Sequence, residues 1–426
     1  MSDFIEKKSD FLGEHYYETT HESGLKIAVF PKDFETFFAE VTVGFGSVNA
    51  FVGDDGKKLP EGIAHFLEHK MFANADGEDS MEKFARLGGS SNAFTTYNLT
   101  TYFFSCHDNF EENLEILLKM VTEPYFTDAN VAKEQGIIAQ EIKMGYDEPY
   151  EMLLLNGMKC MYGVLPVRDD IAGTVESISE ITPELLYRCH KAGYSPANMN
   201  LTVCGRADKE KVLETVNRIF GKEKAEKVSL PTEREPEAVV SPRAECEMEV
   251  SKPLFCVMVK NSDIGETPEE RAKENAIYDV LTEMYFGPTS DFVSDLYEQG
   301  KIISSSAEMT HLDGFSFFRF CGDCEDPDGI MTLFKEYTAR IREEKPDEKE
   351  IAAAKRAVLA DHVKDFDSTE NIAIMLSCDY LIEGTDLFDY KDDLEAVTAE
   401  DISSKLNTLF DPERYVLSAV KPNKRS

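Results

Sequence analysis

Two histidines and a glutamate stand together near the start of the chain, in the stretch His65-Phe66-Leu67-Glu68-His69. His65 and His69 are four positions apart, so on a helix they lie on the same side, about one turn from each other. Two neutral imidazoles at this spacing can bind one metal ion, and zinc accepts such ligands. Glu68 is too close along the same helix to be a relaxed third ligand. Its chemistry suits a general base that acts on a zinc-bound water.

The residues around this motif predict a helix with one apolar side. Pro60 and Gly62 stand just before the motif and suit the start of a helix. Apolar side chains then recur at helical spacing, at Ile63, Ala64, Phe66, Leu67 and Met71. A surface helix that pairs two histidines with a glutamate and binds no metal is the alternative. With eight histidines in 426 residues such a cluster is uncommon by chance, which favours zinc.

A catalytic zinc site takes three protein ligands and keeps one position for water. We therefore expect a carboxylate from another element. Residues 128–144 predict a long helix, with Asp128 as its N-cap. Glu134 and Glu141 are seven positions apart on this helix, two turns, and so share a face.

The combination of His-x-x-Glu-His with a later helix that carries two glutamates seven apart resembles the pitrilysin/insulinase family of zinc peptidases, the inverzincins. The resemblance implies that His65, His69 and Glu141 hold one zinc ion per chain. Glu141 follows His69 by 72 positions (141 − 69). It also implies that Glu134 supports the site by orienting an imidazole. A solvated helix glutamate is the alternative for Glu134.

The stretch from Ser90 to Cys106 is rich in threonine and aromatic residues and predicts two strands joined at Asn98. In the family that the chain resembles, the first of these strands is the edge on which a peptide substrate lies as an added strand. The substrate-binding residues implied in this way are Asn92, Ala93, Phe94 and Thr95. An ordinary half-buried strand is the alternative.

Composition limits the classes of partner. The hydrophobic fraction of 42% is normal for a globular protein. A net charge of −36 argues against nucleic acid and anionic membranes as partners and is compatible with basic or extended peptides. The sequence contains no stretch of eighteen apolar residues, so we expect no membrane span.

The N-terminus and the cysteines indicate the cytoplasm of a bacterium. The first ten residues lack the apolar run of a secretory signal and carry acids that a mitochondrial presequence avoids. Nine scattered cysteines, an odd number, do not suggest a disulfide framework and fit a reducing compartment. The Cys-x-x-Cys stretch from Cys321 to Cys324 is interpreted as ordinary thiols, with a redox role as a weak alternative.

A chain of this length suggests more than one domain. Strands are predicted at 16–20, 25–30 and 37–44, before the motif helix. Charged residues and three prolines between Lys222 and Glu247 indicate a linker. We expect an N-terminal zinc-binding peptidase domain at 1–225, a linker at 226–247 and a C-terminal domain at 248–426.

The second half repeats the first. Residues 181–203 align without a gap on residues 397–419, an offset of 216 (397 − 181). A repeat of this length indicates duplicated domains. The expected fold is α+β, with two duplicated α/β-sandwich domains, each an antiparallel-rich sheet with helices packed on it, forming half of a clamshell chamber. At the same offset the motif positions become Leu281, Met284, Tyr285 and Ala357, so the second copy has no metal site.

The second copy departs from the resembled family in one stretch. There an arginine and a tyrosine near the scissile bond are expected in a Leu-Arg-Glu-x-x-Gly-Leu-x-Tyr pattern. Residues 296–304 carry Tyr297 in place of the arginine, and no tyrosine follows the glycine. Some bacterial members work as pairs of a zinc-bearing and a zinc-less subunit. The chain is most similar to the zinc-bearing subunit of Gram-positive bacteria, so we expect a heterodimer, with a homodimer as the alternative.

The function that these features indicate is that of a zinc-dependent endopeptidase. It would hydrolyse short or unfolded peptides in an enclosed chamber, with Glu68 as the general base on a zinc-bound water. The alternative is a non-catalytic subunit of a two-subunit complex, either peptide-binding or structural and concerned with maturation.

Overall fold

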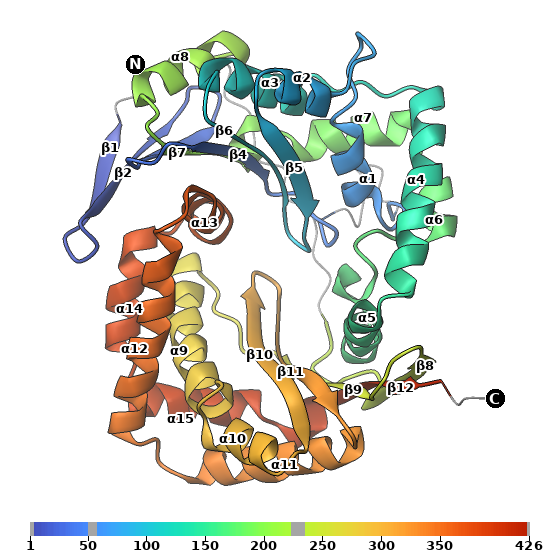
Figure 1. The fold of residues 1–426 in the computed structure, drawn as a ribbon, viewed down its shortest axis with the longest axis vertical. Helices are drawn as coiled ribbons and strands as arrows, with labels where there is room; N and C mark the ends of the chain where they lie inside the picture. The colour runs from blue at the N-terminus through green and yellow to red at the C-terminus, as the bar shows by residue number, and fades with distance from the viewer. Residues whose placement is uncertain (1–3, 50–57, 223–234, 424–426) are drawn as a thin grey trace. The chain divides into compact units, whose positions relative to one another are not determined.

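The chain folds into two sheets, each covered by helices, in a computed structural model that describes residues 4–49, 58–222 and 235–423 (Figure 1). The first sheet has seven strands in the order β1-β2-β3-β7-β4-β6-β5. These strands are β1 (Ile5–Ser9), β2 (Glu14–Thr20), β3 (Lys26–Pro31), β4 (Phe37–Val43), β5 (Ser90–Thr95), β6 (Thr100–Cys106) and β7 (Met199–Gly205). Every neighbouring pair is antiparallel except β3 with β7. The predicted strands at 16–20, 25–30 and 37–44 are confirmed as β2, β3 and β4.

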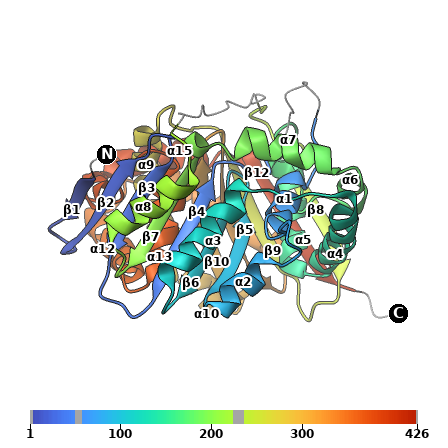
Figure 2. The same cartoon turned by 90° about the horizontal axis from the view of Figure 1, so that it is seen from above.

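Helices cover one face of this sheet, and Figure 2 shows α3 and α8 lying across its strands. The helices of this part of the chain are α1 (Ile63–Lys70), α2 (Ser80–Arg86), α3 (Phe110–Thr122), α4 (Asp128–Tyr146), α6 (Val175–Ser179), α7 (Pro183–Gly193) and α8 (Lys209–Ile219). Their apolar sides and the strands share one buried core. The predicted N-cap of α4 is displaced by one residue, because the hydroxyl of Thr127 accepts the N–H of Asn130 at 3.2 Å.

The second sheet has five strands in the order β10-β11-β9-β12-β8. Its strands are β8 (Arg243–Met248), β9 (Leu254–Asn261), β10 (Ile302–Leu312), β11 (Phe315–Cys324) and β12 (Tyr415–Pro422). The helices that belong with it are α9 (Pro268–Phe286), α10 (Asp291–Glu298), α11 (Pro327–Glu343), α12 (Glu348–Asp365), α14 (Tyr390–Ala396) and α15 (Ala399–Leu409). A second apolar core, rich in phenylalanine, lies between this sheet and its helices.

The two sheets confirm the internal duplication. Read from the other edge, the order β8-β12-β9-β11-β10 matches β3-β7-β4-β6-β5 strand for strand. The parallel pair recurs at the same place, as β3 with β7 and as β8 with β12. Helix α7 begins at Pro183 and α15 at Ala399, again an offset of 216 (399 − 183). The expected α+β fold of two similar sheet-and-helix domains is therefore confirmed.

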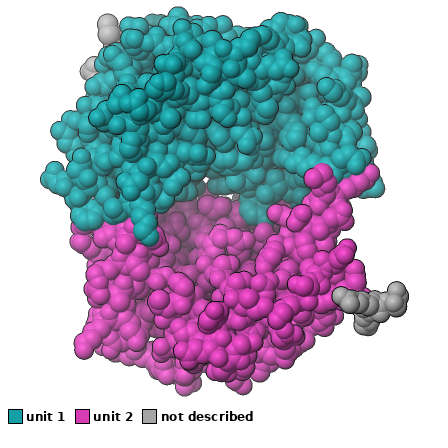
Figure 3. Space-filling model, in the orientation of Figure 1, with its two compact units in different colours: residues 1–142, 170–231, 363–388 teal, residues 143–169, 232–362, 389–426 magenta. Residues whose placement is uncertain are grey.

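The two compact units are not contiguous in sequence. Unit 1 comprises residues 1–142, 170–231 and 363–388, and unit 2 comprises residues 143–169, 232–362 and 389–426 (Figure 3). The expected division into 1–225, 226–247 and 248–426 stays a prediction. In the structure residues 143–169 belong to unit 2 and residues 363–388 to unit 1. Each of these two segments packs on the sheet formed by the other half of the chain. The two segments correspond in the duplication. Residues 143–169 begin at the end of α4, and residues 363–388 begin at the end of α12, the equivalent helix of the second copy.

Helix α5 (Pro149–Met161) lies on β8, β9 and β12 in unit 2. Gly157 allows this close packing, since a Cβ there would come within 2.2 Å of the Met258 sulfur. In unit 1, α13 (Thr369–Ile374) and the π-helix η3 (Met375–Leu381) lie against β4 and β7. The Ser377 Oγ is 2.6 Å from both Thr42 Oγ1 and Asn200 Oδ1. Specific contacts therefore hold both exchanged segments.

The linker expected at 226–247 is structured in its second part. Residues 226–234 lie outside the described residues, but Arg243–Met248 form β8, which pairs with β12. The carboxylate of Glu235 accepts hydrogen bonds from the backbone N–H groups of Val164 and Leu165. It also forms an ion pair with buried Lys260 at 2.8 Å. The charged residues of this stretch suggested a solvated linker, but the charge of Glu235 instead holds the segment in unit 2.

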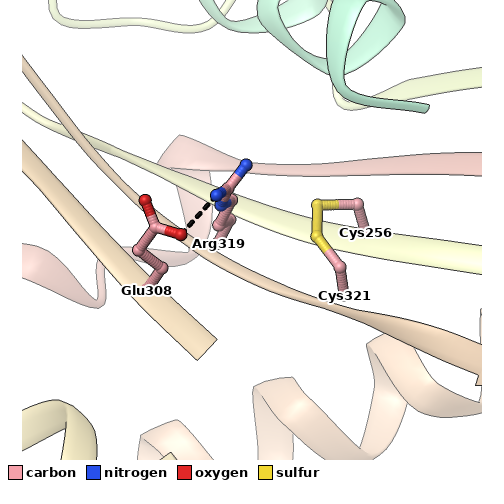
Figure 4. Close-up of a disulfide and its surroundings, with 4 residues drawn as sticks. All are labelled: Cys256, Glu308, Arg319 and Cys321. Atoms are coloured by element: carbon pink, nitrogen blue, oxygen red, sulfur yellow. Dashed lines mark hydrogen bonds and ion pairs between the residues drawn. A yellow bond between two sulfur atoms is a disulfide. The ribbon is translucent and has the colours of Figure 1, made fainter. Parts of the chain in front are cut away.

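The interpretation of Cys321 as an ordinary thiol is wrong. Cys256 on β9 and Cys321 on β11 face each other across the antiparallel strands and form a disulfide (Figure 4). An ion pair between Arg319 and Glu308 lies beside it. Cys324, the other cysteine of the Cys-x-x-Cys stretch, is buried and takes no part in this bond. The partner of Cys321 comes from a neighbouring strand 65 positions away, which no local spacing could reveal.

Among the described residues, no helix is both long and apolar enough to cross a bilayer.

Glu40 is buried in the middle of β4, in the first sheet. Burial, reinforced by the charges of Asp379 and Glu370, raises the pKa of Glu40 from 4.5 to about 8. The folded protein therefore holds a proton there that the unfolded chain releases above about pH 4.5. Because the unfolded state binds fewer protons between these values, the free energy of unfolding falls as the pH rises from about 4.5 to 8.

We expect Glu40→Gln to remove this loss of stability. At pH 8 the variant should exceed the wild type in free energy of unfolding by an amount on the order of 4 kcal/mol, and at pH 4 the gain should vanish. Denaturant unfolding of both proteins at the two pH values measures the difference. Glu112→Gln, at an exposed position of α3, is the matched control. An equal gain at both pH values would show that Glu40 does not hold a proton in the folded state.

Candidate metal centre and peptide-binding edge

Helix α1 carries the motif residues into unit 1. It begins after Gly62, whose φ of 86° is a conformation that glycine adopts readily. A Cβ on Gly62 would lie 2.3 Å from the carbonyl oxygen of Ala172, so the close approach of this second segment also requires glycine. Ile63, Phe66 and Leu67 are buried in the core and fix the rotation of the helix. The opposite side of α1 then presents both histidines.

Three donor groups from two helices meet at this side of α1. The His65 Nε2 lies 3.5 Å from Glu141 Oε1, and the His69 Nε2 lies 3.4 Å from Glu141 Oε2. The two imidazole centroids are 4.7 Å apart. In the described part of the chain, these are the residues whose metal-ligating atoms form a cluster, within 4.8 Å of one another. Of the two glutamates on α4, Glu141 faces the imidazole nitrogens that remain available.

The spacing of these atoms fits a tetrahedral metal ion. Two ligands that are each about 2.1 Å from a tetrahedral zinc lie about 3.4 Å from each other. The separations of 3.4 and 3.5 Å between the glutamate oxygens and the histidine nitrogens match that value. The Nδ1 of His65 is buried and has no hydrogen-bond partner among the described residues. The donor set of two imidazoles and one carboxylate is one that zinc takes.

Electrostatics keeps the carboxylate of Glu141 ready for a cation. The hydrogen bond with His65, helped by the nearby His69, holds the pKa of Glu141 below its ordinary value. Glu141 is also half exposed, with 49% of its side chain accessible, so the centre opens to solvent on this side. A metal ion and a small ligand could reach the site from there.

Glu134 lies on the same face of α4 as Glu141 but makes different contacts. Its Oε1 lies 3.2 Å from His69 Nδ1, and its Oε2 lies 3.1 Å from the Nζ of Lys70. Burial alone would raise the pKa of Glu134, but the hydrogen bond from His69 and the charge of Lys70 lower it. An ionised Glu134 fixes the proton of His69 on Nδ1 and leaves Nε2 for a metal. These contacts are compatible with the orienting role that the resemblance implied for Glu134, which stays a prediction.

Lys70 is a residue of the site that the sequence did not reveal. Only 5% of its side chain is exposed, and its ammonium compensates the buried charge of Glu134. The signal in the sequence was a lysine directly after His69 on a helix with an apolar side. A lysine at the end of a helix usually extends into solvent, so this signal was weak.

We expect Glu134→Gln to weaken metal binding by about 10- to 100-fold without abolishing it. The amide can still contact His69, but it carries no charge to balance the imidazole and Lys70. Titration of the metal-loaded protein with a chelator of known affinity measures the effect. Glu112→Gln, which lies outside the cluster, should leave the affinity unchanged. Equal affinities for Glu134→Gln and wild type would remove Glu134 from the site.

Glu68 lies on the same helix between the two histidines and is not part of the donor cluster. It is 7% exposed, and its Oε2 lies 2.6 Å from the hydroxyl of Thr95. Glu68 directly precedes His69 in the chain and contributes no atom to the donor cluster. Its role as a general base stays a prediction.

The four residues implied in substrate binding lie on β5, the last strand of the first sheet. Helix α1 packs against this strand. Ala93 and Thr95 pair with Tyr102 and Thr100 of β6 and point toward the helices. Asn92 and Phe94 point to the opposite face, where the Phe94 ring is 6.2 Å from that of Phe103. Among the described residues no strand pairs with the outer edge of β5, so its main chain is available for an added strand.

The second copy has apolar residues where the first has the metal centre. Leu281 and Tyr285 of α9 are buried in the core of unit 2, and Met284 packs against it. Tyr297, which stands where the resemblance expects an arginine, lies on α10 with 65% of the residue exposed. Within the part of unit 2 that the structure describes, no three histidine, cysteine, aspartate or glutamate side chains form a cluster like that of His65, His69 and Glu141.

The chain is similar to two family models and to several known proteins. A model of the insulinase family (peptidase family M16) matches residues 38–175, and a model of the M16 inactive domain matches residues 180–358. The chain is 36% identical to an uncharacterized zinc protease of Bacillus subtilis, YmfH, over 96% of this chain and 97% of that protein. A putative M16-like peptidase from Alicyclobacillus acidocaldarius superposes with a TM-score of 0.89 at 28% identity and covers 99% of both chains. A chain of complex III2 from Candida albicans shares the fold alone, with a TM-score of 0.75 at 13% identity over 95% of both chains.

Proposed function

Because the chain belongs to the insulinase (M16) family of peptidases, we propose that it is a zinc-dependent endopeptidase that cuts short or unfolded peptides. The observation that carries this proposal is the meeting of His65, His69 and Glu141 at distances that suit tetrahedral zinc, with Glu68 beside them. The name of the Bacillus subtilis relative, a zinc protease, supports both the metal and the reaction class.

The residues of the site have separate tasks in this proposal. His65, His69 and Glu141 hold the zinc ion, and Glu134 with Lys70 orients His69. A zinc ion held here supplies an acidic water and polarises the peptide carbonyl. Glu68 accepts a proton from the attacking water and gives it to the leaving amine.

The substrate is an extended peptide that lies along β5. The outer edge of β5 offers unpaired main-chain groups, and β5 packs against α1, which carries Glu68 and both histidines. A peptide added there brings a main-chain carbonyl toward the metal whatever its side chains are. Recognition through the main chain suits an enzyme that accepts many sequences. The charge of −36 would favour basic peptides.

We further propose that the chain works in a pair with a zinc-less subunit of the same family. The stretch at 296–304 supports a missing partner, because Tyr297 replaces the expected arginine. A partner that carries the arginine and tyrosine would complete the substrate contacts, whereas a homodimer would not. We place this pair in the cytoplasm of a bacterium.

The test is metal content and peptide cleavage by the purified chain. We expect about one zinc per chain, cleavage of a mixed library of quenched peptides, and loss of both on treatment with a chelator. Zinc without cleavage, restored by a co-purified second subunit, would support the paired enzyme. Full activity of a monomeric chain would contradict the need for a partner. Zinc and peptide binding without cleavage under any of these conditions would favour a non-catalytic binding subunit.

A further inference from the structure

A threonine of the edge strand contacts the glutamate between the two histidines. Thr95 is the last residue of β5, and its hydroxyl lies 2.6 Å from Glu68 Oε2. Among the described residues Thr95 is the hydrogen-bond donor found for this carboxylate. The contact joins two elements, α1 and β5, whose residues are 27 positions apart. It therefore depends on the packing of the helix against the strand.

The network around Thr95 fixes the direction of this hydrogen bond. The Thr95 hydroxyl is also 3.2 Å from the hydroxyl of Thr100, which in turn lies 2.8 Å from the carbonyl oxygen of Phe45. That carbonyl can only accept, so the proton of Thr100 is engaged there. The proton of Thr95 can go to Thr100 or to Glu68. The carboxylate is nearer and charged, so Thr95 donates to Glu68.

This hydrogen bond restricts the carboxylate of Glu68. With Oε2 bound to Thr95, rotation of the carboxyl group is limited and Oε1 is left to accept another proton. A glutamate has three side-chain torsions, so without such a contact its carboxylate samples several positions. The rate of a reaction that requires one of these positions is then lower. The side chain of Thr95 points toward the helices, while its main chain lies at the edge of the sheet.

We propose that Thr95 is a positioning residue, whose hydroxyl holds Glu68 in the orientation needed for proton transfer and ties that orientation to the strand that receives the peptide. The inference rests on the proposed function. It assigns the side chain of Thr95 to the base, whereas the resemblance assigned this residue only to the substrate. The main chain of β5 would then align the peptide, and the Thr95 side chain of the same strand would align the base. One strand would therefore fix the position of each relative to the other.

Thr95→Val tests the proposal, because it keeps the shape and the strand propensity of the side chain and removes only the donor. We expect kcat to fall by about 10- to 100-fold, the range for loss of a hydrogen bond to a charged group. KM should change less than about twofold, since the peptide contacts the main chain, and bound zinc should be unchanged. Thr95→Ser restores the hydroxyl and should recover kcat to within about threefold.

Thr101→Val is the matched control. Thr101 is on β6, in the same hairpin, and its hydroxyl bonds to Thr42 on the other face of the sheet. This variant loses a buried hydroxyl without any contact to Glu68, so its kcat should stay near that of the wild type. An equal loss of kcat in Thr101→Val and Thr95→Val would mean that damage to the sheet is the cause.

A crystal structure of zinc-loaded Thr95→Val gives a readout independent of turnover. We expect the Glu68 carboxylate to occupy a second position or to lose defined density. An unmoved carboxylate would overturn the inference, even if the purified chain needs a partner to cleave peptides. Full kcat in Thr95→Val together with an inactive Glu68→Gln would also overturn it and leave the proposed function standing. If zinc-loaded wild type cleaves nothing with or without a partner, the proposed function itself fails.

Discussion

Replacing Glu68 with glutamine is expected to lower kcat for peptide cleavage by about 10²- to 10⁴-fold while the protein keeps its zinc. Glutamine has nearly the same shape and can still accept the hydroxyl proton of Thr95 through its amide oxygen. Its amide cannot take a proton from water at neutral pH. Because Glu68 is outside the donor cluster of His65, His69 and Glu141, its loss leaves the metal ligands complete.

Zinc content by elemental analysis and initial rates on a quenched peptide, measured on the same preparation, give the two numbers needed. Glu82→Gln, at an exposed position of α2, is the control for a change of one charge and should cleave normally. Near-normal cleavage by Glu68→Gln would refute the assignment of the base. Loss of zinc from Glu68→Gln would instead show that Glu68 belongs to the metal site.

Replacing any one of His65, His69 or Glu141 with alanine is expected to remove the zinc and, with it, the cleavage. Each residue supplies one of three donor atoms that lie within 4.8 Å of one another. A catalytic zinc site needs three protein ligands, so two remaining ligands should bind zinc too weakly to survive dialysis. Bound zinc should fall from about one per chain to near zero. Glu134→Gln, by contrast, should keep zinc at a reduced affinity, because the Glu134 carboxylate contacts His69 and Lys70 and is not one of the three donor groups.

Thermal unfolding separates loss of metal from loss of fold. A ligand that binds only the folded state raises its stability. The melting temperature of the wild type should therefore increase when zinc is added, whereas the three alanine variants should melt at one temperature with or without zinc. His107→Ala, an exposed histidine outside the cluster, should respond to zinc like the wild type. A variant of the cluster that still binds one zinc tightly would exclude that residue from the ligand set.

The duplication explains why these effects fall on one half of the chain. Both copies have the same strand order, and in both the segment after the long fourth helix packs on the sheet of the other copy. The second copy replaces the polar cluster by Leu281, Met284 and Tyr285, which join a continuous apolar core. Burying two histidines and a glutamate without a metal would cost stability, and the apolar residues at this position of the second copy avoid that cost.

The sequence alone determined the features that depend on the period of a single element. Four-residue spacing puts His65 and His69 on one side of α1, and seven-residue spacing puts Glu134 and Glu141 on one side of α4, whatever the rest of the chain does. The constant offset of 216 (397 − 181) likewise predicted the duplication and the loss of the motif in the second copy. These inferences held because helical and repeat periods are properties of local sequence.

Only the tertiary structure decided which side chains of different elements meet. It shows Glu141 against both Nε2 atoms and Glu134 against Nδ1 and Lys70, although the two glutamates are equivalent along α4. It also shows the hydroxyl of Thr95 hydrogen-bonded to Glu68. The disulfide and the exchanged segments at 143–169 and 363–388 depend in the same way on which strands and helices are neighbours. Such contacts are fixed by the packing of whole elements, whose free energy is summed over many residues and is not encoded in any local spacing.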